Sequence, residues 1–285
     1  MPNSISDTIK LNDGNQMPIL GFGTYKLADQ DSMDAAIDAA FKAGYRLFDT
    51  AQFYNNEHLL GNSIKKLQIN RNEIFITTKI PEPKQGYQST LDAIDESLAN
   101  LQTDYIDLLL VHWPVRSHFF ETWRAFEDAK KAGKVKSIGV SNYHQTHLDL
   151  LKTQATEMPA VNQIEVHPYL SQKSMLAANN EEQIVTQAWS PMGRGATLHD
   201  ETIQAIAKAH GKSVAQVILR WHLQNGVAII PKSSTPERIL ENGDLFDFEL
   251  SDHEMQSIDD LNQDMRTGDD PEVVYEIEHQ YPRHK

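Results

Sequence analysis

Short apolar runs alternate with longer amphipathic segments along most of this chain, and this alternation restricts the fold more than any other feature. The apolar runs predict eight strands, at 19–23, 46–49, 74–79, 106–112, 135–140, 160–165, 184–189 and 227–231. The segments between them predict helices, among them 31–43, 57–67, 90–101, 122–132 and 201–209. Several runs are apolar almost throughout, which is typical of parallel strands that are buried on both faces.

Eight strand and helix units in about 250 residues predict a (β/α)8 barrel, which we expect to form a single domain over residues 1–285. A doubly wound sheet is the alternative. That fold usually has fewer strands and a G-x-G-x-x-G turn after the first strand, of which Gly21 and Gly23 supply only the first half. The alternation therefore favours the barrel.

Three further elements are expected around the barrel. The turn signal Asn12-Asp-Gly14 predicts a β-hairpin over residues 8–17, placed at the barrel floor. Two helices are expected in addition to the eightfold pattern, at 213–224 and at 251–262. A capping box from Ser251 to Glu254 marks the start of the second.

Composition excludes several classes of protein. The chain has no cysteine, which rules out disulfides, thiolate metal sites and cysteine nucleophiles. No run reaches the roughly 18 to 20 apolar residues of a spanning helix, and residues 1–13 lack a leader pattern, so we expect a cytoplasmic protein without a membrane partner. With 40 acidic and 26 basic residues, the chain is also not expected to bind nucleic acid. We expect a monomer.

The acidic excess is concentrated at the end of the chain. Residues 241–285 contain 14 acidic and 3 basic side chains, whereas the first 240 residues are nearly neutral. We therefore separate residues 263–285 as an acidic C-terminal segment. If this segment borders the active site, its charge should disfavour anionic substrates.

Polar residues follow the predicted strand ends, and in a barrel these ends converge on one mouth. Asp49 ends the second strand and precedes Tyr54, Lys79 ends the third, and His112 ends the fourth. A cation beside a phenol lowers the phenol's pKa, so Lys79, aimed by Asp49, would make Tyr54 a proton donor. His112 would orient a carbonyl oxygen by hydrogen bonding.

Each of these residues alone also has a structural interpretation, as a helix cap, a packed loop residue, a solvated strand end or a core histidine. Together they form a proton donor for a carbonyl oxygen. The sequence contains no evident nucleophile pair to attack the carbonyl carbon, so a hydride from a bound cofactor is the natural partner.

An anionic cofactor has a candidate site after the last strand, at Lys232-Ser-Ser-Thr235-Pro-Glu-Arg238. A helix start surrounded by hydroxyl groups and cations is typical of a phosphate site. A capped surface helix is the alternative interpretation.

Three segments resemble the signature segments of the aldo-keto reductase family. They are Gly44-Tyr-Arg-Leu-Phe-Asp-Thr-Ala-Gln-Phe-Tyr54 with the residues up to Gly61, Lys136-Ser-Ile-Gly-Val-Ser-Asn142, and Ile230-Pro-Lys232 with the residues up to Arg238. The likeness runs from about residue 9 to residue 262. It implies a barrel that binds NADPH across its mouth and reduces aldehydes or ketones to alcohols.

The resemblance assigns roles residue by residue. It implies that Tyr54 is the general acid, that Lys79 and Asp49 tune it, and that His112 orients the carbonyl. The implied cofactor contacts are Ser141, Asn142 and Gln163 at the carboxamide, Trp189 stacked on the nicotinamide, Ser190 and Arg194 along the pyrophosphate, Lys232, Ser233, Thr235 and Arg238 at the 2′-phosphate, and Glu241 and Asn242 near the adenine. The presence of both Lys232 and Arg238 favours NADPH over NADH.

The expected substrate wall departs from the family pattern. Tyr25 stands where tryptophan is common, and the chain from Thr267 onward lacks the usual pattern. We expect Tyr25, His112 and Trp113 to contact a small carbonyl substrate in an open pocket.

Two other function classes remain open at this point. A metal-dependent barrel hydrolase would use Asp49, His112, Glu165 and His167 as ligands, although Glu165 and His167 also have structural interpretations. We expect no metal. A cofactor-binding subunit without catalytic activity is the third class, and the complete set at Asp49, Tyr54, Lys79 and His112 argues against it.

Overall fold

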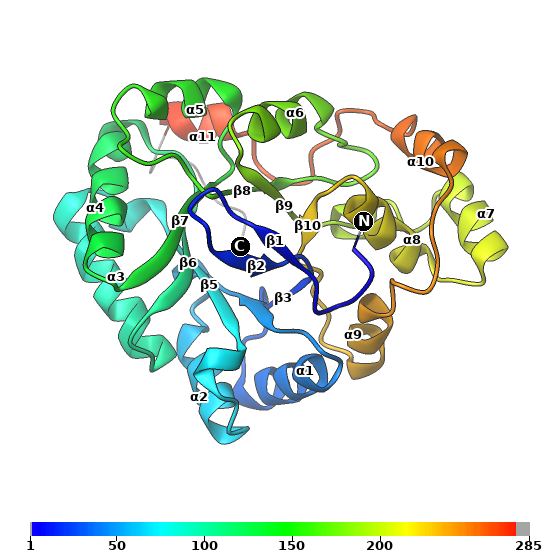
Figure 1. Ribbon diagram of the computed structural model, residues 1–285, viewed down its shortest axis with the longest axis horizontal. Helices are drawn as coiled ribbons and strands as arrows, with labels where there is room; N and C mark the ends of the chain where they lie inside the picture. Colours follow the sequence, from blue (N-terminus) through cyan, green and yellow to red (C-terminus); the bar gives the residue numbers. More distant parts are fainter. Residues whose placement is uncertain (1, 278–285) are drawn as a thin grey trace.

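Parallel strands form a barrel at the centre of the computed structural model, which describes residues 2–277. Within that range each strand pairs with the next along the chain (Figure 1). The strands are β3 (Gly21–Gly23), β4 (Leu47–Asp49), β5 (Phe75–Ile80), β6 (Ile106–Val111), β7 (Val135–Ser141), β8 (Val161–Glu165), β9 (Val185–Trp189) and β10 (Ala228–Ile229).

The ring is closed by contacts between its first and last strands. The amide of Ile229 donates to the carbonyl of Ile19 (2.9 Å), and the amide of Gly23 donates to the carbonyl of Pro231 (3.2 Å). The predicted (β/α)8 barrel is therefore confirmed. Every residue of β5 and β6 is buried, because the barrel interior covers one face of these strands and helices cover the other.

Helices surround the barrel. Those that follow successive strands are α1 (Gln30–Lys42), α2 (Glu57–Lys66), α3 (Tyr87–Leu101), α4 (Phe119–Lys131), α5 (Gln145–Lys152), α6 (Lys173–Glu181), α8 (Val214–Gln224) and α9 (Pro236–Gly243). Further helices within the described residues are α7 (Glu201–His210), α10 (Asp252–Asp259) and α11 (Pro271–Ile277). The capping box at Ser251 and Glu254 forms at the start of α10, as predicted.

One prediction about the additional helices is wrong. The helix at 213–224 was expected to lie outside the eightfold pattern, but α8 packs against strand β10. The additional helix is α7, which packs on α8 and α10. The physical reason is that α7 and the segment 244–250 both cover α8, so it is buried from Gln216 to Leu223 even though it carries polar residues such as Arg220.

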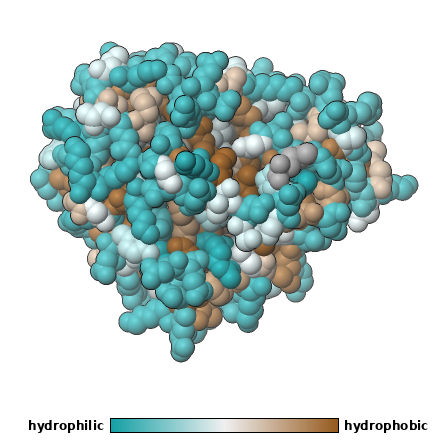
Figure 2. Space-filling model, viewed as in Figure 1, coloured by the Kyte–Doolittle hydropathy of each residue, from teal (hydrophilic) through white to brown (hydrophobic). Residues whose placement is uncertain are grey.

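The N-terminal hairpin lies across the end of the barrel where the strands begin. Strand β1 (Thr8–Lys10) pairs with β2 (Gln16–Pro18) in an antiparallel register, and Figure 1 shows them in front of the strand ring. The side chain of Asn12 donates to the carbonyl of Pro159 (2.9 Å) and fixes the hairpin to the segment before β8. Figure 2, taken from the same side, shows a mostly hydrophilic face with smaller hydrophobic areas.

The far end of the described chain also folds back onto the barrel. Helix α11 lies beside α5 (Figure 1), where Glu272 accepts a hydrogen bond from Thr146 (2.8 Å) and lies 3.0 Å from Nδ1 of His144. The segment between α10 and α11 reaches the carboxyl end of β8, where the amide of Thr267 donates to Glu165 (2.8 Å). No helix in the described part of the chain combines the length and apolar character needed to span a bilayer.

Candidate active site

A cavity of about 740 Å³ opens at the carboxyl ends of the strands. It is lined by most of the residues that the sequence singled out: Tyr25, Asp49, Tyr54, His112, Trp113, Ser141, Asn142, Gln163, Trp189, Ser190, Arg194, Lys232, Ser233, Arg238, Glu241 and Asn242. Lys79 and Thr235 are not part of the lining. The barrel therefore brings together residues from several strand ends, as expected for this fold.

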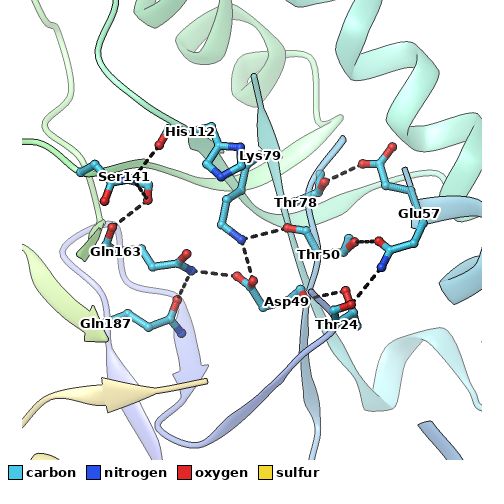
Figure 3. A network of polar contacts seen from close by, with 12 residues as sticks. Thr24, Asp49, Thr50, Glu57, Thr78, Lys79, His112, Ser141, Gln163 and Gln187 are labelled. Carbon is cyan, nitrogen blue, oxygen red and sulfur yellow. Dashed lines mark hydrogen bonds and ion pairs between the residues drawn. The ribbon is translucent and has the colours of Figure 1, made fainter. Parts of the chain in front are cut away.

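Lys79 lies beneath the cavity floor and forms a buried ion pair with Asp49. Its Nζ donates to Oδ1 of Asp49 (2.6 Å) and to the carbonyl of Thr50 (2.9 Å), and the two charged side chains are 1% and 2% exposed. Figure 3 shows this pair at the centre of a polar network that continues from Asp49 to Gln163 (2.8 Å). Burial lowers the pKa of Lys79 and raises that of Asp49, and their mutual attraction opposes both shifts.

This pair supports a prediction about stability. Asp49→Asn should lower the free energy of unfolding by about 3–5 kcal/mol, because it leaves the Lys79 charge buried without a counter-ion. Urea denaturation measures the loss. Asp38→Asn is the matched control, since Asp38 forms an exposed pair with Lys42 (2.7 Å; 40% and 71% exposed) and should change stability by less than about 1 kcal/mol. Equal losses of unfolding free energy in the two variants would show that the buried pair stabilises the fold no more than the exposed one.

Tyr54 lies close to both the ion pair and His112. It ends a single 3-10 turn after β4, η1 (Gln52–Tyr54), which Asn55 terminates in the left-handed conformation at φ 53°. The Nζ of Lys79 lies 5.2 Å from the centroid of the Tyr54 ring, and the His112 ring centroid lies 5.9 Å from it in a T-shaped arrangement. The four predicted catalytic side chains are thus adjacent.

His112 is an uncharged ring at neutral pH. Burial, with a smaller contribution from the charge of Lys79, holds the pKa of His112 well below its ordinary value. Its Nδ1 is buried and has no hydrogen-bond partner among the described residues. A neutral imidazole carries one N–H and can donate it to an oxygen without bringing a second charge to the site.

Three polar side chains beside His112 present acceptors to the cavity. The side-chain amide of Gln163 donates its two hydrogens to Asp49 and to Gln187 (2.7 Å). Only the side-chain oxygen of Gln163 is therefore left to bind a ligand, as an acceptor. The Asn142 amide donates to the carbonyl of His112 (3.0 Å), and its oxygen accepts from the indole of Trp189 (2.8 Å) and keeps a second lone pair. The Ser141 hydroxyl donates to the backbone carbonyl of Gln163 (2.7 Å). This set suits a ligand amide that donates hydrogens.

The other end of the cavity is positively charged. Lys232 and Arg238 line it, and burial together with the charge of Lys26 lowers the pKa of Lys232. Arg194 also lines the cavity, with its guanidinium carbon 6.0 Å from the centroid of the Trp189 ring. Cations held this close favour an anionic ligand. Thr235 is the exposed residue at the start of α9, and its side chain makes no capping hydrogen bond. Its contact with a phosphate stays a prediction.

The ligand set of a barrel hydrolase is not assembled. Asp49 is bound to Lys79 and Gln163, whereas Glu165 accepts from the amide of Thr267 (2.8 Å) and lies 3.2 Å from Nε2 of His167. Among residues 2–277, no group of three His, Asp or Glu side chains is placed to hold a metal ion. The acidic residues thus have structural partners.

Some lining residues were missed by sequence reasoning. Lys26 lines the charged end, and its signal was available, because it follows the first strand directly after Tyr25. Asp269 also lines the cavity. No local pattern could have placed it, because it reaches the mouth only through the fold of the C-terminal segment. That segment therefore contributes Asp269 to the lining of a pocket that was expected to be open.

The fold and the site define a (β/α)8 enzyme with a buried lysine–aspartate pair, a tyrosine and a neutral histidine at a cavity that several cationic side chains also line. A sequence model of the aldo/keto reductase family matches residues 19–263. The chain belongs to this family of oxidoreductases.

Individual relatives extend over nearly the whole chain. Glyoxal reductase of Bacillus subtilis is 47% identical over 274 residues, which cover 96% of this chain and 99% of that protein. Morphine 6-dehydrogenase of Pseudomonas putida is 45% identical and covers 94% and 96% of the two chains. A crystal structure of a Gox0644 variant in complex with NADPH superposes with a TM-score of 0.90, at 40% identity, over 94% of this chain and 98% of that one.

Proposed function

We propose that this protein reduces aldehydes and ketones to alcohols with NADPH, and that Tyr54 is the general acid. The observation that carries the proposal is the placement of the Tyr54 ring 5.2 Å from the buried Lys79 ammonium and 5.9 Å from His112. Membership of the aldo/keto reductase family supports it.

Each of the four polar side chains has a distinct role in this proposal. His112 donates a hydrogen bond to the carbonyl oxygen and orients it. Tyr54 transfers its phenolic proton to that oxygen as negative charge develops there. Lys79 stabilises the phenolate that remains, and Asp49 holds Lys79 in place.

NADPH would supply the hydride that the carbonyl carbon receives. The acceptors of Ser141, Asn142 and Gln163 fit a carboxamide, and Trp189 provides an aromatic face for the nicotinamide. At the far end, Lys232 and Arg238 fit a 2′-phosphate. We add Lys26 to the cations of this end. The NADPH complex of the related Gox0644 variant supports the choice of cofactor.

The proposed function is tested by following NADPH absorbance with the purified protein and a panel of aldehydes, ketones and α-dicarbonyls. We expect carbonyl-dependent loss of NADPH that a chelator does not affect. NADPH binding without oxidation by any member of the panel would instead favour a non-catalytic subunit. Hydrolytic activity that a chelator abolishes would favour the metal-dependent class.

We also propose that the enzyme prefers uncharged carbonyl compounds, because the acidic C-terminal segment reaches the cavity at Asp269. Asp269→Asn should raise kcat/KM for 4-formylbenzoate relative to its uncharged methyl ester by about three- to tenfold, since it removes a repulsive charge. Asp252→Asn, in exposed α10, is the control of equal charge and should leave the ratio unchanged. An unchanged ratio in Asp269→Asn would refute the preference.

A further inference from the structure

Glu165, the last residue of β8, binds a segment that follows it in sequence by about a hundred residues. Its Oε1 accepts from the amide of Thr267 (2.8 Å) and from the hydroxyl of the same residue, and its Oε2 accepts from the amide of Gly268 (3.1 Å). The side chain is fully shielded from solvent. Two consecutive backbone amides are therefore fixed by one buried carboxylate.

The state of this carboxylate follows from its surroundings. Burial alone would raise the pKa of Glu165, but the hydrogen bonds from His167, Thr267 and Gly268 together leave it below its ordinary value. Glu165 is thus ionised at neutral pH, and hydrogen bonds to an ionised acceptor are stronger than those between neutral groups.

The bound segment lies directly against Trp189. A Cβ added to Gly268 would stand 2.4 Å from Cη2 and 3.3 Å from Cζ2 of the indole, so the glycine is in close contact with the edge of that ring. The indole Nε1 is held by Oδ1 of Asn142 (2.8 Å). Glu165 and Trp189 are also register partners on the neighbouring strands β8 and β9. The ring is therefore fixed by Asn142 and by Gly268.

A second contact joins Glu165 to the other side of the site. Its partner His167 packs against Gly193, where an added Cβ would lie 3.2 Å from the imidazole. Gly193 belongs to the turn that carries Ser190 and Arg194 at the cavity wall. The Glu165–His167 pair thus supports the segments on both sides of Trp189.

We propose that Glu165 is a positioning residue of the cofactor site. Its hydrogen bonds place Thr267 and Gly268 so that Gly268 contacts the edge of the Trp189 ring. This contact holds the indole in the orientation that stacking on the nicotinamide requires. The inference rests on the proposed NADPH-dependent function. It assigns the buried carboxylate a role in nicotinamide binding rather than in proton transfer or metal binding.

Glu165→Gln tests this role, because the amide replaces one of the two acceptor oxygens with a donor that faces the donors of the segment. Hydrogen exchange at Gly268 should accelerate at least about tenfold. The Kd for NADPH should rise about tenfold, whereas the Kd for adenosine 2′,5′-bisphosphate, which lacks the nicotinamide, should stay within about twofold of the unaltered protein.

Glu127→Gln is the matched control. Glu127 is also buried, and its Oε1 accepts from two consecutive backbone amides, those of Thr156 (2.7 Å) and Glu157 (3.0 Å), but it does not line the cavity. This variant should lose stability and leave both dissociation constants unchanged. Gly268→Ala is a second variant, which keeps the carboxylate. It should raise the Kd for NADPH but not that for adenosine 2′,5′-bisphosphate, because its methyl group displaces the indole.

Three outcomes decide between the alternatives. An unchanged NADPH Kd in Glu165→Gln, despite faster exchange at Gly268, would reduce Glu165 to an anchor of the C-terminal segment and overturn the inference. Equal weakening of NADPH and adenosine 2′,5′-bisphosphate would also overturn it, since that indicates general disorder. Failure of the unaltered protein to bind NADPH, while it still protects Gly268 from exchange, would refute the proposed function itself.

Discussion

Tyr54→Phe is expected to lower kcat for carbonyl reduction by roughly 10²–10⁴-fold, the range that a general acid contributes. Phenylalanine keeps the ring that packs against Tyr25 (4.9 Å between centroids) and His112 (5.9 Å). Only the hydroxyl group is lost, so the shape of the cavity and the Lys79–Asp49 pair beneath it should persist. The Kd for NADPH should change by less than about twofold.

The measurement is steady-state and single-turnover oxidation of NADPH, with cofactor binding titrated separately. Tyr87→Phe is the matched control, because its hydroxyl donates to Asp128 (3.0 Å) on the outer helices and does not line the cavity. That variant should retain full activity. If Tyr54→Phe kept its full single-turnover rate, another group would have to be the acid.

Arg238→Ala is expected to raise the Kd for NADPH by about 10- to 100-fold and to leave the Kd for NADH nearly unchanged. A hydrogen bond between charged groups contributes about 1.5–3 kcal/mol, and NADH lacks the phosphate that Arg238 would contact. Arg238 is exposed at the first turn of α9, next to the cavity that Lys232 and Ser233 also line. Lys232→Met should act in the same direction.

Titration of both cofactors at two salt concentrations checks this prediction. Salt should weaken NADPH binding more in the unaltered protein than in Arg238→Ala, because the variant has lost one phosphate contact. Arg116→Ala is the control, since Arg116 pairs with Glu276 at the surface and does not line the cavity. Equal losses of NADPH and NADH affinity would place Arg238 away from the 2′-phosphate.

Prediction from the sequence was most successful for the barrel strands. Runs such as 106–111 are buried on both faces, so apart from Asp107 they are apolar and easy to recognise. Helix α6 (Lys173–Glu181) was not identified, since only Met175 and Asn179 are buried and its apolar face is weak. The roles of α7 and α8 were exchanged, because what covers a helix is a property of the packed structure.

The candidate site also contains features that the sequence predicted and features that it did not. Its members could be identified because strand ends converge in a barrel, so Asp49, Lys79 and His112 are neighbours once the strands are placed. The pairing of Lys79 with Asp49 was also expected, and the structure shows it. The full burial of that pair and the acceptors that fix the Gln163 amide, Asp49 and Gln187, have no local pattern in the chain and could not be predicted.

The sequence by itself determined the strand order, the barrel and the chemical groups at its mouth, because these depend on local periodicity and on the geometry common to parallel barrels. Only the tertiary structure decided how the C-terminal segment takes part in the site. Glu165 meets Thr267 across 102 residues of sequence, and Gly268 thereby reaches Trp189. A contact of this kind depends on where packing brings distant backbone together, and no periodicity along the chain encodes it.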